Sequence, residues 1–241
     1  MTKNQFASYI DHTLLSPDAK SAQIERLCAE ALRYGFASVC VNPVYVPLAA
    51  QKLVGSAVKV CTVIGFPLGA STTAAKMFEA ADAIKNGASE IDMVMDVGAA
   101  KDGRFSALED DIAGVVRSCR QTAAGITVKV ILETCFLGDD EIVSACLCAK
   151  NAGADFVKTS TGFASPKNAD GQTVFNGATG HHIKLMRETV GAEMGVKASG
   201  GIRDVRAAVT MLEAGASRIG TSSGVILVEG WDESADVRAR F

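Results

Sequence analysis

Two lysines late in the chain lie where a lysine could act as a nucleophile. Lys158 belongs to the β-branched run Phe156–Ser160 and Lys197 to the run Val196–Ser199, and a loop rich in glycine and serine follows each run. A lysine amine attacks a carbonyl carbon only when it is unprotonated, and at the ordinary lysine pKa of about 10.4 only about one amine in a few thousand is free at pH 7. A second ammonium a few ångströms away disfavours the charged form. If the fold brings these side chains together, they indicate amine catalysis on an aldehyde or ketone, which needs no metal and no cofactor.

Acidic side chains in the run Glu90–Asp96 could move the protons that such a reaction requires. Side chains alternate along a strand, and those that face a covering helix must be apolar. Ile91 and Met93 therefore face outward, which turns Asp92 and Asp96 toward the interior. Working through a water molecule, Asp92 could pass protons to and from a carbinolamine. By the same alternation the interior also receives Asp11, Thr13, Cys40, Asn42, Lys129, Glu133, Ser160 and Ser199.

Short β-branched runs alternate with amphipathic segments of ten or more residues along the whole chain, which predicts eight strand–helix units. No break in composition divides them, so we expect one α/β domain over residues 1–241: a closed (β/α)8 TIM barrel with a short N-terminal segment and a short C-terminal tail. A doubly wound sheet is the alternative, but no run is shortened or charged as an edge strand would be. The first long helix is expected to follow Ser16 as N-cap, with Pro17 at its first position. The runs are Tyr9–Thr13, Ser38–Asn42, Lys59–Ile64, Glu90–Asp96, Val128–Glu133, Phe156–Ser160, Val196–Ser199 and Arg218–Thr221.

Charged side chains inside such a barrel need an explanation. The axis of an ordinary TIM barrel is filled by Val, Ile and Leu, and a buried charge costs several kcal/mol unless it is paired. A lysine at the start of a strand can instead reach water along its aliphatic stem, and we expect this of Lys59. That explanation fits Lys158 and Lys197 poorly, because both lie toward the carboxyl ends of their strands, where barrel enzymes carry their chemistry.

Glycine-rich loops follow the seventh and eighth runs, at the place where barrels commonly bind phosphate. Ser199–Gly201 and Gly220–Gly224 could offer backbone N–H groups to an oxyanion, because glycine allows a close approach of the backbone. The chain has no Walker lysine motif and no dinucleotide fingerprint, so a small phosphorylated metabolite is favoured over a nucleotide. The polar stretch 161–176 is long for a connection, and we expect it to cover the substrate.

The composition excludes several classes of partner. The 241 residues hold 24 Lys and Arg against 27 Asp and Glu, a net charge of −3, so the basic excess of nucleic-acid binders is missing. No stretch reaches about 18 uninterrupted apolar residues and the first residues lack the apolar core of a signal peptide, so we expect a cytoplasmic protein without a membrane segment. Seven cysteines and three histidines fit reduced core thiols better than disulfides or a zinc site.

Two motifs near the lysines and six further segments resemble one known family. The motifs are Lys-Thr-Ser-Thr-Gly at Lys158–Gly162 and Lys-Ala-Ser-Gly-Gly at Lys197–Gly201. Together the segments resemble the deoxyribose-phosphate aldolase family of class I aldolases over nearly the whole chain. The resemblance implies reversible cleavage of 2-deoxy-D-ribose 5-phosphate to acetaldehyde and D-glyceraldehyde 3-phosphate, in deoxyribonucleotide catabolism. The further segments are Asp11–Leu15, Val39–Pro43, Gly65–Gly69, Glu90–Val94, Lys129–Thr134 and Arg218–Gly224.

The resemblance also implies roles for single residues. Lys158 matches the Schiff-base lysine, Lys197 the second lysine that tunes it, and Asp92 the aspartate of a proton relay. Two positions depart from the pattern of some relatives: Phe163 stands where they carry a phosphate-binding lysine, and Phe241 stands where they end in a tyrosine. The candidate substrate- and phosphate-binding residues are Gly162, Gly200, Gly201, Gly220, Ser222 and Ser223.

Two other functions remain open at this point. The lysine pair alone would permit a transaldolase-like carbon-transfer enzyme, and the charged interior could belong to a sugar-phosphate-binding barrel without catalysis. The expected partners are phosphosugar and aldehyde substrates and further copies of the chain, as a dimer or larger oligomer, because such barrels commonly associate.

Overall fold

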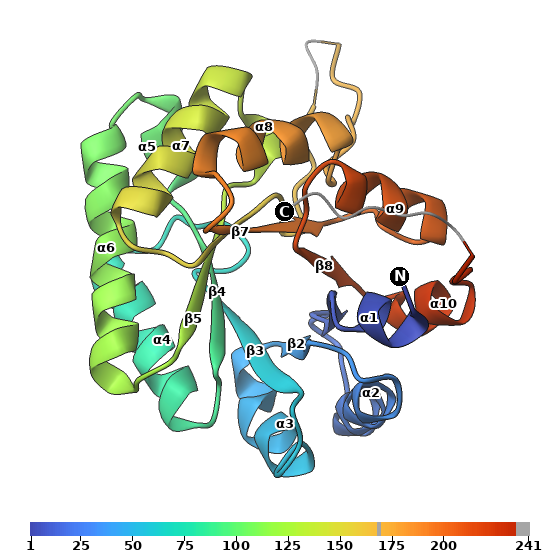
Figure 1. Cartoon of the computed structure of the whole chain (residues 1–241). Helices are drawn as coiled ribbons and strands as arrows, with labels where there is room; N and C mark the ends of the chain where they lie inside the picture. Colours follow the sequence, from blue (N-terminus) through green and yellow to red (C-terminus); the bar gives the residue numbers. More distant parts are fainter. Residues whose placement is uncertain (168–169, 235–241) are drawn as a thin grey trace.

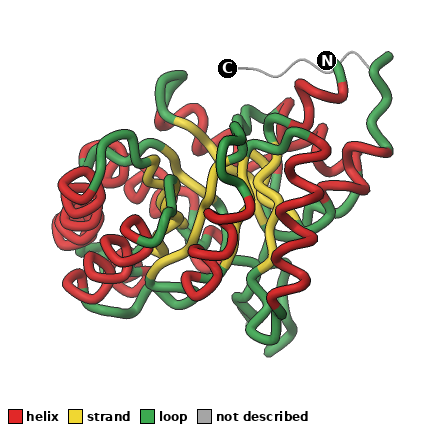
Figure 2. The backbone as a smooth tube through the Cα atoms, turned by 90° about the horizontal axis from the view of Figure 1, so that it is seen from below, coloured by secondary structure: helices red, strands yellow, loops and turns green. Residues whose placement is uncertain are grey.

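The structure, a computed structural model, describes residues 1–167 and 170–234 and contains a closed barrel of eight parallel strands. The strands pair in chain order, and β1 closes the ring against β8. Figure 1 shows the helices wrapped around this ring, and Figure 2 shows the strands enclosed by helices in a second view. The strands are β1 Ile10–Leu14, β2 Ser38–Val41, β3 Lys59–Ile64, β4 Glu90–Val94, β5 Thr127–Ile131, β6 Phe156–Lys158, β7 Gly195–Ser199 and β8 Arg218–Thr221.

The TIM-barrel prediction is confirmed, and each predicted run contains one strand or most of one. The predicted bounds of β3 and β8 are those of the structure, whereas β4 and β6 each end two residues earlier than predicted. The helices are α1 Lys3–Ala7, α2 Ser21–Tyr34, α3 Val46–Lys52, α4 Thr73–Lys85, α5 Val97–Lys101, α6 Phe105–Thr122, α7 Asp139–Asn151, α8 Gly180–Val190, α9 Val205–Glu213 and α10 Gly224–Glu229, with short 3₁₀ turns at Pro43–Tyr45 and Thr134–Phe136.

The hydrophobic core lies between the outer face of the barrel and the helices. In α2 the residues Ile24, Leu27 and Ala31 form one buried stripe at helical spacing, and the helix ends at Gly35 in the left-handed conformation. A second, small apolar cluster forms from Leu15, Cys40, Cys61 and Val63. All seven cysteines are free, and six are buried, as expected of core thiols.

The two ends of the described chain meet beside β1 and β8. The ring of Phe6 in α1 stacks on Trp231, which follows α10, with 3.9 Å between ring centroids. The indole N–H of Trp231 donates to the carbonyl of Met1. The short N-terminal segment is therefore fastened to the last helix. Phe241 lies outside the described residues.

Two local predictions are wrong. The first long helix begins at Ser21 and not after Ser16, because the Ser16 hydroxyl bonds to Asp18 and the Ser16 carbonyl accepts the N–H of Ala19 in a separate turn. Asp96 does not face the axis: the chain leaves β4 after Val94, and the Asp96 carboxylate caps α5 by accepting the N–H of Ala99 at 3.0 Å. Lys59 is exposed at the start of β3, as predicted.

No helix in the described parts of the chain combines the length and the apolarity that crossing a membrane requires.

Candidate active site

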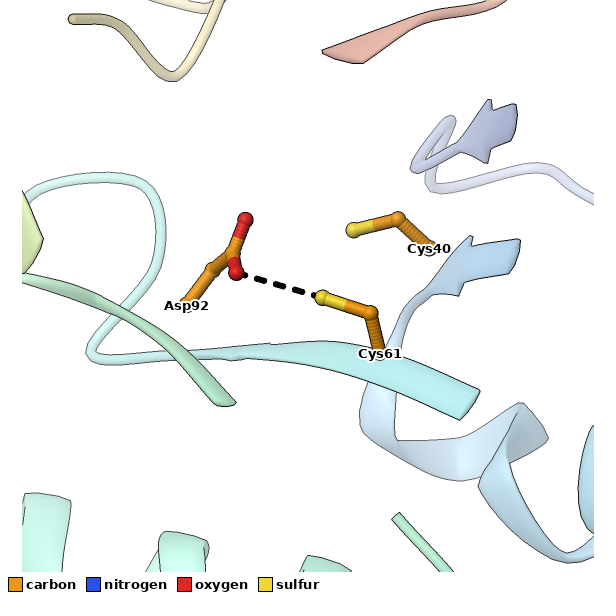
Figure 3. A group of neighbouring side chains, drawn as sticks. All are labelled: Cys40, Cys61 and Asp92. Atoms are coloured by element: carbon orange, nitrogen blue, oxygen red, sulfur yellow. Dashed lines mark hydrogen bonds between the residues drawn. The ribbon is translucent and has the colours of Figure 1, made fainter. Parts of the chain in front are cut away.

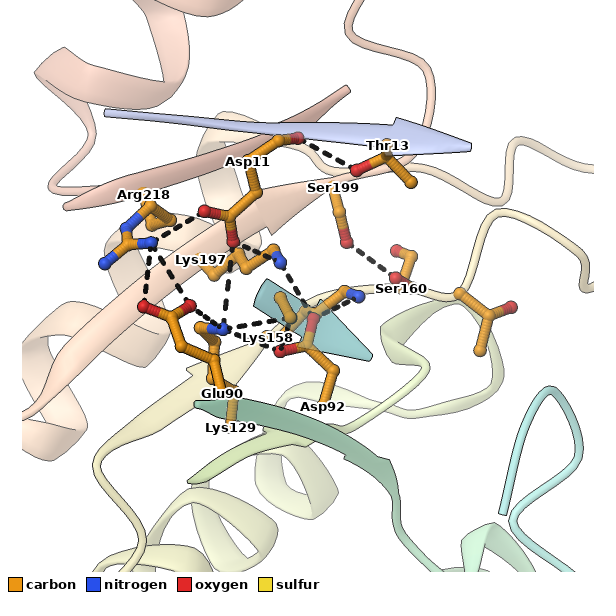
Figure 4. A network of polar contacts seen from close by, with 12 residues as sticks. Asp11, Thr13, Glu90, Asp92, Lys129, Lys158, Ser160, Lys197, Ser199 and Arg218 are labelled. Carbon is orange, nitrogen blue, oxygen red and sulfur yellow. Dashed lines mark hydrogen bonds and ion pairs between the residues drawn. The ribbon is translucent and has the colours of Figure 1, made fainter. Parts of the chain in front are cut away.

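One carboxylate joins the two lysines that the sequence singled out. Lys158 ends β6 and Lys197 lies in β7, and the two residues are register partners in adjacent strands. The Nζ atom of each lysine donates to the same atom, Oδ2 of Asp92 from β4, at 2.8 Å. Asp11 of β1 binds Lys197 from the other side at 2.5 Å. The alternation of strand side chains thus brings Lys158, Lys197 and Asp92 together, as predicted (Figure 4).

A second layer of charges lies below these residues. Lys129 of β5 contacts Glu90 at 2.5 Å and Oδ1 of Asp92 at 2.8 Å. Arg218 of β8 contacts Asp11 at 2.6 Å and Glu90 at 3.3 Å. Sequence reasoning missed Glu90 and Arg218, although the alternation that turned Asp92 inward holds for both of them.

The electrostatics of this network favour charged groups in spite of burial. Burial alone would raise the pKa of Asp92, but Lys129, Lys158 and Lys197 outweigh it and lower that pKa well below its ordinary value. Burial likewise opposes the charge of Lys197, but Asp11 and Asp92 outweigh it and raise the pKa of this lysine. Asp92 is therefore a carboxylate and Lys197 an ammonium at neutral pH, so Lys158 has a cation as its neighbour when the site holds no substrate.

A cavity of about 400 Å³ opens above the charge network at the carboxyl ends of the strands. Lys158 lies at this cavity, whereas Asp92 and Lys197 lie beneath it and are fully buried. Of the predicted binding residues, Gly162 and Ser223 do not line the cavity, and Ser223 is instead the N-cap residue of α10. The predicted binding residues that do line the cavity are Gly200, Gly201, Gly220 and Ser222.

The loop after β7 owes its shape to its glycines. Gly200 and Gly201 have φ of +87° and +76°, in the left-handed region that other residues rarely adopt. A Cβ on Gly201 would lie 2.8 Å from the ring of Phe175, and the Gly200 carbonyl accepts the N–H of Ala178 at 3.0 Å. Phe175, in the described part of the stretch 161–176, therefore packs on this loop, and the role of the stretch as a substrate cover stays a prediction. Arg203 also lines the cavity, and its position just after the glycine pair is the signal that could have identified it.

Phe163 forms part of the cavity wall through an ordered turn. The Thr161 hydroxyl bonds to the buried carboxylate of Glu133 and accepts the N–H of Phe163 at 3.0 Å. The Phe163 ring packs edge-on against Phe66, with 5.2 Å between centroids. The cavity wall is therefore aromatic at Phe163, where the resemblance implied a lysine in some relatives.

Within residues 1–167 and 170–234, two groups of buried side chains have donor atoms within 4.8 Å of one another, the spacing that a metal ion requires. Figure 3 shows one of them, Cys40 and Cys61 beside Asp92. The other consists of Asp11, Cys61 and Glu90. Every carboxylate in these groups already binds a lysine or arginine at 2.5 to 2.8 Å, and those cations oppose the entry of a metal ion.

Known proteins share this sequence over most of its length. Residues 6–227 match the DeoC/LacD family of aldolases. The chain is 54% identical over 232 residues to deoxyribose-phosphate aldolase 1 of Staphylococcus aureus strain MRSA252, which covers 96% of this chain and 99% of that protein. It is 56% identical over 228 residues to the deoxyribose-phosphate aldolase of Geobacillus sp. strain WCH70, with 95% and 96% covered.

Solved structures agree with this assignment. The deoxyribose phosphate aldolase of Aeropyrum pernix, whose structure is described as a unique tetramer, superposes with a TM-score of 0.84 at 36% identity over 95% of this chain and 91% of that one. The aldolase QR15 superposes with a TM-score of 0.82 at 39% identity over 93% and 94%. This chain therefore belongs to the DeoC/LacD family of aldolases.

Proposed function

We propose that this aldolase reversibly cleaves 2-deoxy-D-ribose 5-phosphate to acetaldehyde and D-glyceraldehyde 3-phosphate through a Schiff base on Lys158. The observation that carries the proposal is the placement of the two lysines on one Asp92 oxygen, with Lys158 at the cavity and Lys197 buried beneath it. The names of the relatives indicate the substrate. The cavity holds one amine, that of Lys158, beside the glycine-rich loops that follow β7 and β8.

The chemistry follows from these positions. The free amine of Lys158 adds to the C1 aldehyde of the open-chain sugar, and loss of water leaves an iminium. Removal of the proton from the C3 hydroxyl breaks the C2–C3 bond, which releases D-glyceraldehyde 3-phosphate and leaves an enamine. Protonation of C2 and hydrolysis then release acetaldehyde and restore the amine. We assign the proton transfers to Asp92, acting through water, and to Lys197.

The phosphate of the substrate would bind at the glycine loops. Gly200 and Gly201 leave the backbone open to an oxyanion, and Ser222 adds a hydroxyl at the same wall. Arg203 is the cation of this wall, since Phe163 offers no charge. Of the other predicted binding residues, Gly220 borders Lys197, and we keep Gly162 and Ser223 as part of the flanking loops.

Reductive trapping tests the proposal. The chain is incubated with acetaldehyde and cyanoborohydride, and peptide mass mapping should find a two-carbon adduct on Lys158. Lys158→Ala should abolish adduct and turnover, whereas Lys184→Ala, at an exposed lysine of α8, should change neither. An adduct elsewhere would refute the assignment, and use of a ketose fragment in place of acetaldehyde would indicate a transaldolase-like enzyme.

A second measurement tests the absence of a metal from the reaction. Turnover should be unchanged in EDTA, because the amine supplies the electron sink. Loss of activity that a divalent ion restores would indicate a metal-dependent aldolase.

Association and location complete the proposal. Large apolar side chains on the connections that follow β2 and β3 are strongly exposed: Val44 76%, Val54 82%, Leu68 76% and Phe78 74%. We assign an interface between copies of the chain to this region, because exposed apolar side chains commonly mark contacts between proteins. Light scattering should then find a dimer or larger oligomer, which Phe78→Asp should weaken.

We place the enzyme in the cytoplasm, where its free thiols stay reduced.

A further inference from the structure

The charges inside the barrel do not balance. Among the described residues, the network of ion pairs in Figure 4 joins three carboxylates to four cations. With every group in its ordinary ionisation state, the network has a surplus of one positive charge. Water can screen this surplus only weakly, because the groups are buried or nearly so. The carboxylates are Asp11, Glu90 and Asp92, and the cations are Lys129, Lys158, Lys197 and Arg218.

The surplus falls on Lys158. Lys129 and Lys197 each contact two carboxylates at 2.8 Å or less. Arg218 also contacts two, and a guanidinium does not lose its proton in a protein. Among the described residues Lys158 forms an ion pair with Asp92 alone, through an oxygen that it shares with Lys197. Release of a proton by Lys158 therefore balances the network with the smallest loss of ion pairing.

Arg218 adds a positive charge to the network but has no contact with the cavity. It does not line the cavity, and its guanidinium lies 5.5 Å from the ring centroid of Phe156, in the lower layer of the network. It reaches Lys158 only through other side chains, by way of Glu90 and Lys129 or of Asp11 and Lys197. Without Arg218, three lysines would balance three carboxylates.

We propose that Arg218 is a positioning residue whose fixed charge, together with the hold it has on Asp11 and Glu90, drives Lys158 to release its proton at neutral pH. This inference rests on the proposed function, in which Lys158 forms the Schiff base. The fold supplies the charge from β8, two strands along the ring from β6, so the nucleophile is activated from beneath the site as well as by its neighbour Lys197.

Three further ionisable groups face the network. Burial raises the pKa of Glu133, at the mouth after β5, against the lowering effects of its bonds to Thr161 and of the nearby Lys158. Among the described residues its carboxyl bonds to Thr161 and forms no ion pair with the network, so it stands outside the count of ion-paired groups. A hydrogen bond with Cys61 of β3 lowers the pKa of Cys40 of β2, whereas burial raises the pKa of Cys61. Cys40 is thus the other group that could release a proton. A readout specific for Lys158 separates the two.

The test changes the number of charges in the network and measures the reactivity of the Lys158 amine as a function of pH. The pH dependence of reductive trapping at Lys158, read by peptide mass mapping, is compared with the acid limb of kcat/KM. Arg218→Met should move both to higher pH by about 1 unit, the size expected for one charge several ångströms away in a buried site. Arg218→Lys keeps the charge and should leave both near the wild-type position.

Glu90 provides the opposite change. Glu90→Gln enlarges the surplus and should move the limb to lower pH, and Glu90→Gln/Arg218→Met should return it to the wild-type position. If Arg218→Met does not fold, Glu90→Gln decides alone. Arg104→Met, at an exposed arginine outside the barrel, is the control and should cause no shift.

The outcomes separate the two proposals. If wild-type enzyme gives no adduct on Lys158, the proposed function fails. If the adduct forms but its pH dependence is the same in the wild type and in the variants at positions 90 and 218, the role of Arg218 is refuted. The same holds if the pH dependence shifts equally in Arg218→Lys and Arg218→Met. In both cases the proposed function stands.

Discussion

Lys158 and Lys197 share one hydrogen-bond acceptor, the Oδ2 atom of Asp92, which each approaches at 2.8 Å. This arrangement follows from the register of the barrel, because the two lysines are paired positions of β6 and β7 and Asp92 faces them from β4. The shared oxygen holds the Nζ atoms of the two lysines on one carboxylate. The chemistry proposed for Lys158 depends on that arrangement staying intact.

Lys197→Met should therefore reduce kcat by about 10²- to 10⁴-fold, the usual contribution of a positioned proton-transfer group. It removes the cation that disfavours a charge on Lys158, so trapping with acetaldehyde should also slow at pH 7. Steady-state kinetics and the rate of adduct formation check this. Lys197→Arg keeps the positive charge but has no amine that can exchange a proton. Compared with Lys197→Met, it should therefore restore the rate of adduct formation more fully than it restores kcat. Wild-type kcat in Lys197→Met would contradict the role given to this lysine.

Gly220 provides a second test of the lysine geometry. A Cβ at this position would lie 2.9 Å from Cε of Lys197 and 3.2 Å from Cβ of Ser199. Gly220→Ala should therefore displace Lys197 and lower kcat with little change in KM, since the lysine acts on the reacting atoms. Gly138→Ala is the matched control, because its nearest neighbour would be a Glu141 oxygen at 3.8 Å and its φ is −82°. Equal kcat in the two variants would show that Lys197 accommodates the methyl group.

The phosphate loop predicts a different kinetic effect. Gly201→Ala combines a left-handed backbone with a contact of 2.8 Å to Phe175, so the loop must move. KM for 2-deoxy-D-ribose 5-phosphate should rise at least about tenfold, and turnover of unphosphorylated 2-deoxy-D-ribose should change much less. Gly125→Ala has the same backbone strain at φ +75° with nothing within 4 Å, and it should leave both substrates unaffected. An equal loss on both substrates would place the phosphate elsewhere.

Alternation along single strands predicted most of this interior. It identified Asp92, Lys158 and Lys197 because each lies in a run whose other face is plainly apolar. Glu90 and Arg218 obey the same rule, but they stand at the first position of their strands, where the sequence does not show whether a side chain points inward or reaches water. Lys59 is also first in its strand and is exposed. The direction in which the first side chain of a strand points is therefore known only from the structure.

Local side-chain bonds account for the other errors. Ser16 carries the signature of a helix N-cap, but its hydroxyl bonds to Asp18 and the helix begins five residues later. Asp96 looks like a strand residue, but it caps α5. Both outcomes depend on which of two short-range partners a polar side chain takes, and the sequence offers both partners. Phe163 departs from the pattern of some relatives, and this is visible in the sequence. Its packing on Phe66 is not, because that contact joins segments about a hundred residues apart.

A buried ion pair outside the barrel was not predicted at all, and it gives the last test. Lys76 of α4 is completely buried and contacts Asp111 of α6 at 2.7 Å, and the Thr73 hydroxyl donates to the other carboxylate oxygen at 2.7 Å. Lysines in amphipathic helices usually mark the solvent face, so the sequence suggested none of this.

Removing one partner of this pair leaves a charge without compensation in the core. Lys76→Met or Asp111→Leu should each lower the free energy of unfolding by about 3 to 5 kcal/mol, whereas the double variant should lose less than either single one because two apolar side chains then pack together. Urea unfolding measures these values, and Lys184→Ala on the surface should stay within about 0.5 kcal/mol of the wild type. If the two single losses simply add in the double variant, the two side chains do not act as a pair, and the packing of α4 on α6 rests on their apolar neighbours alone.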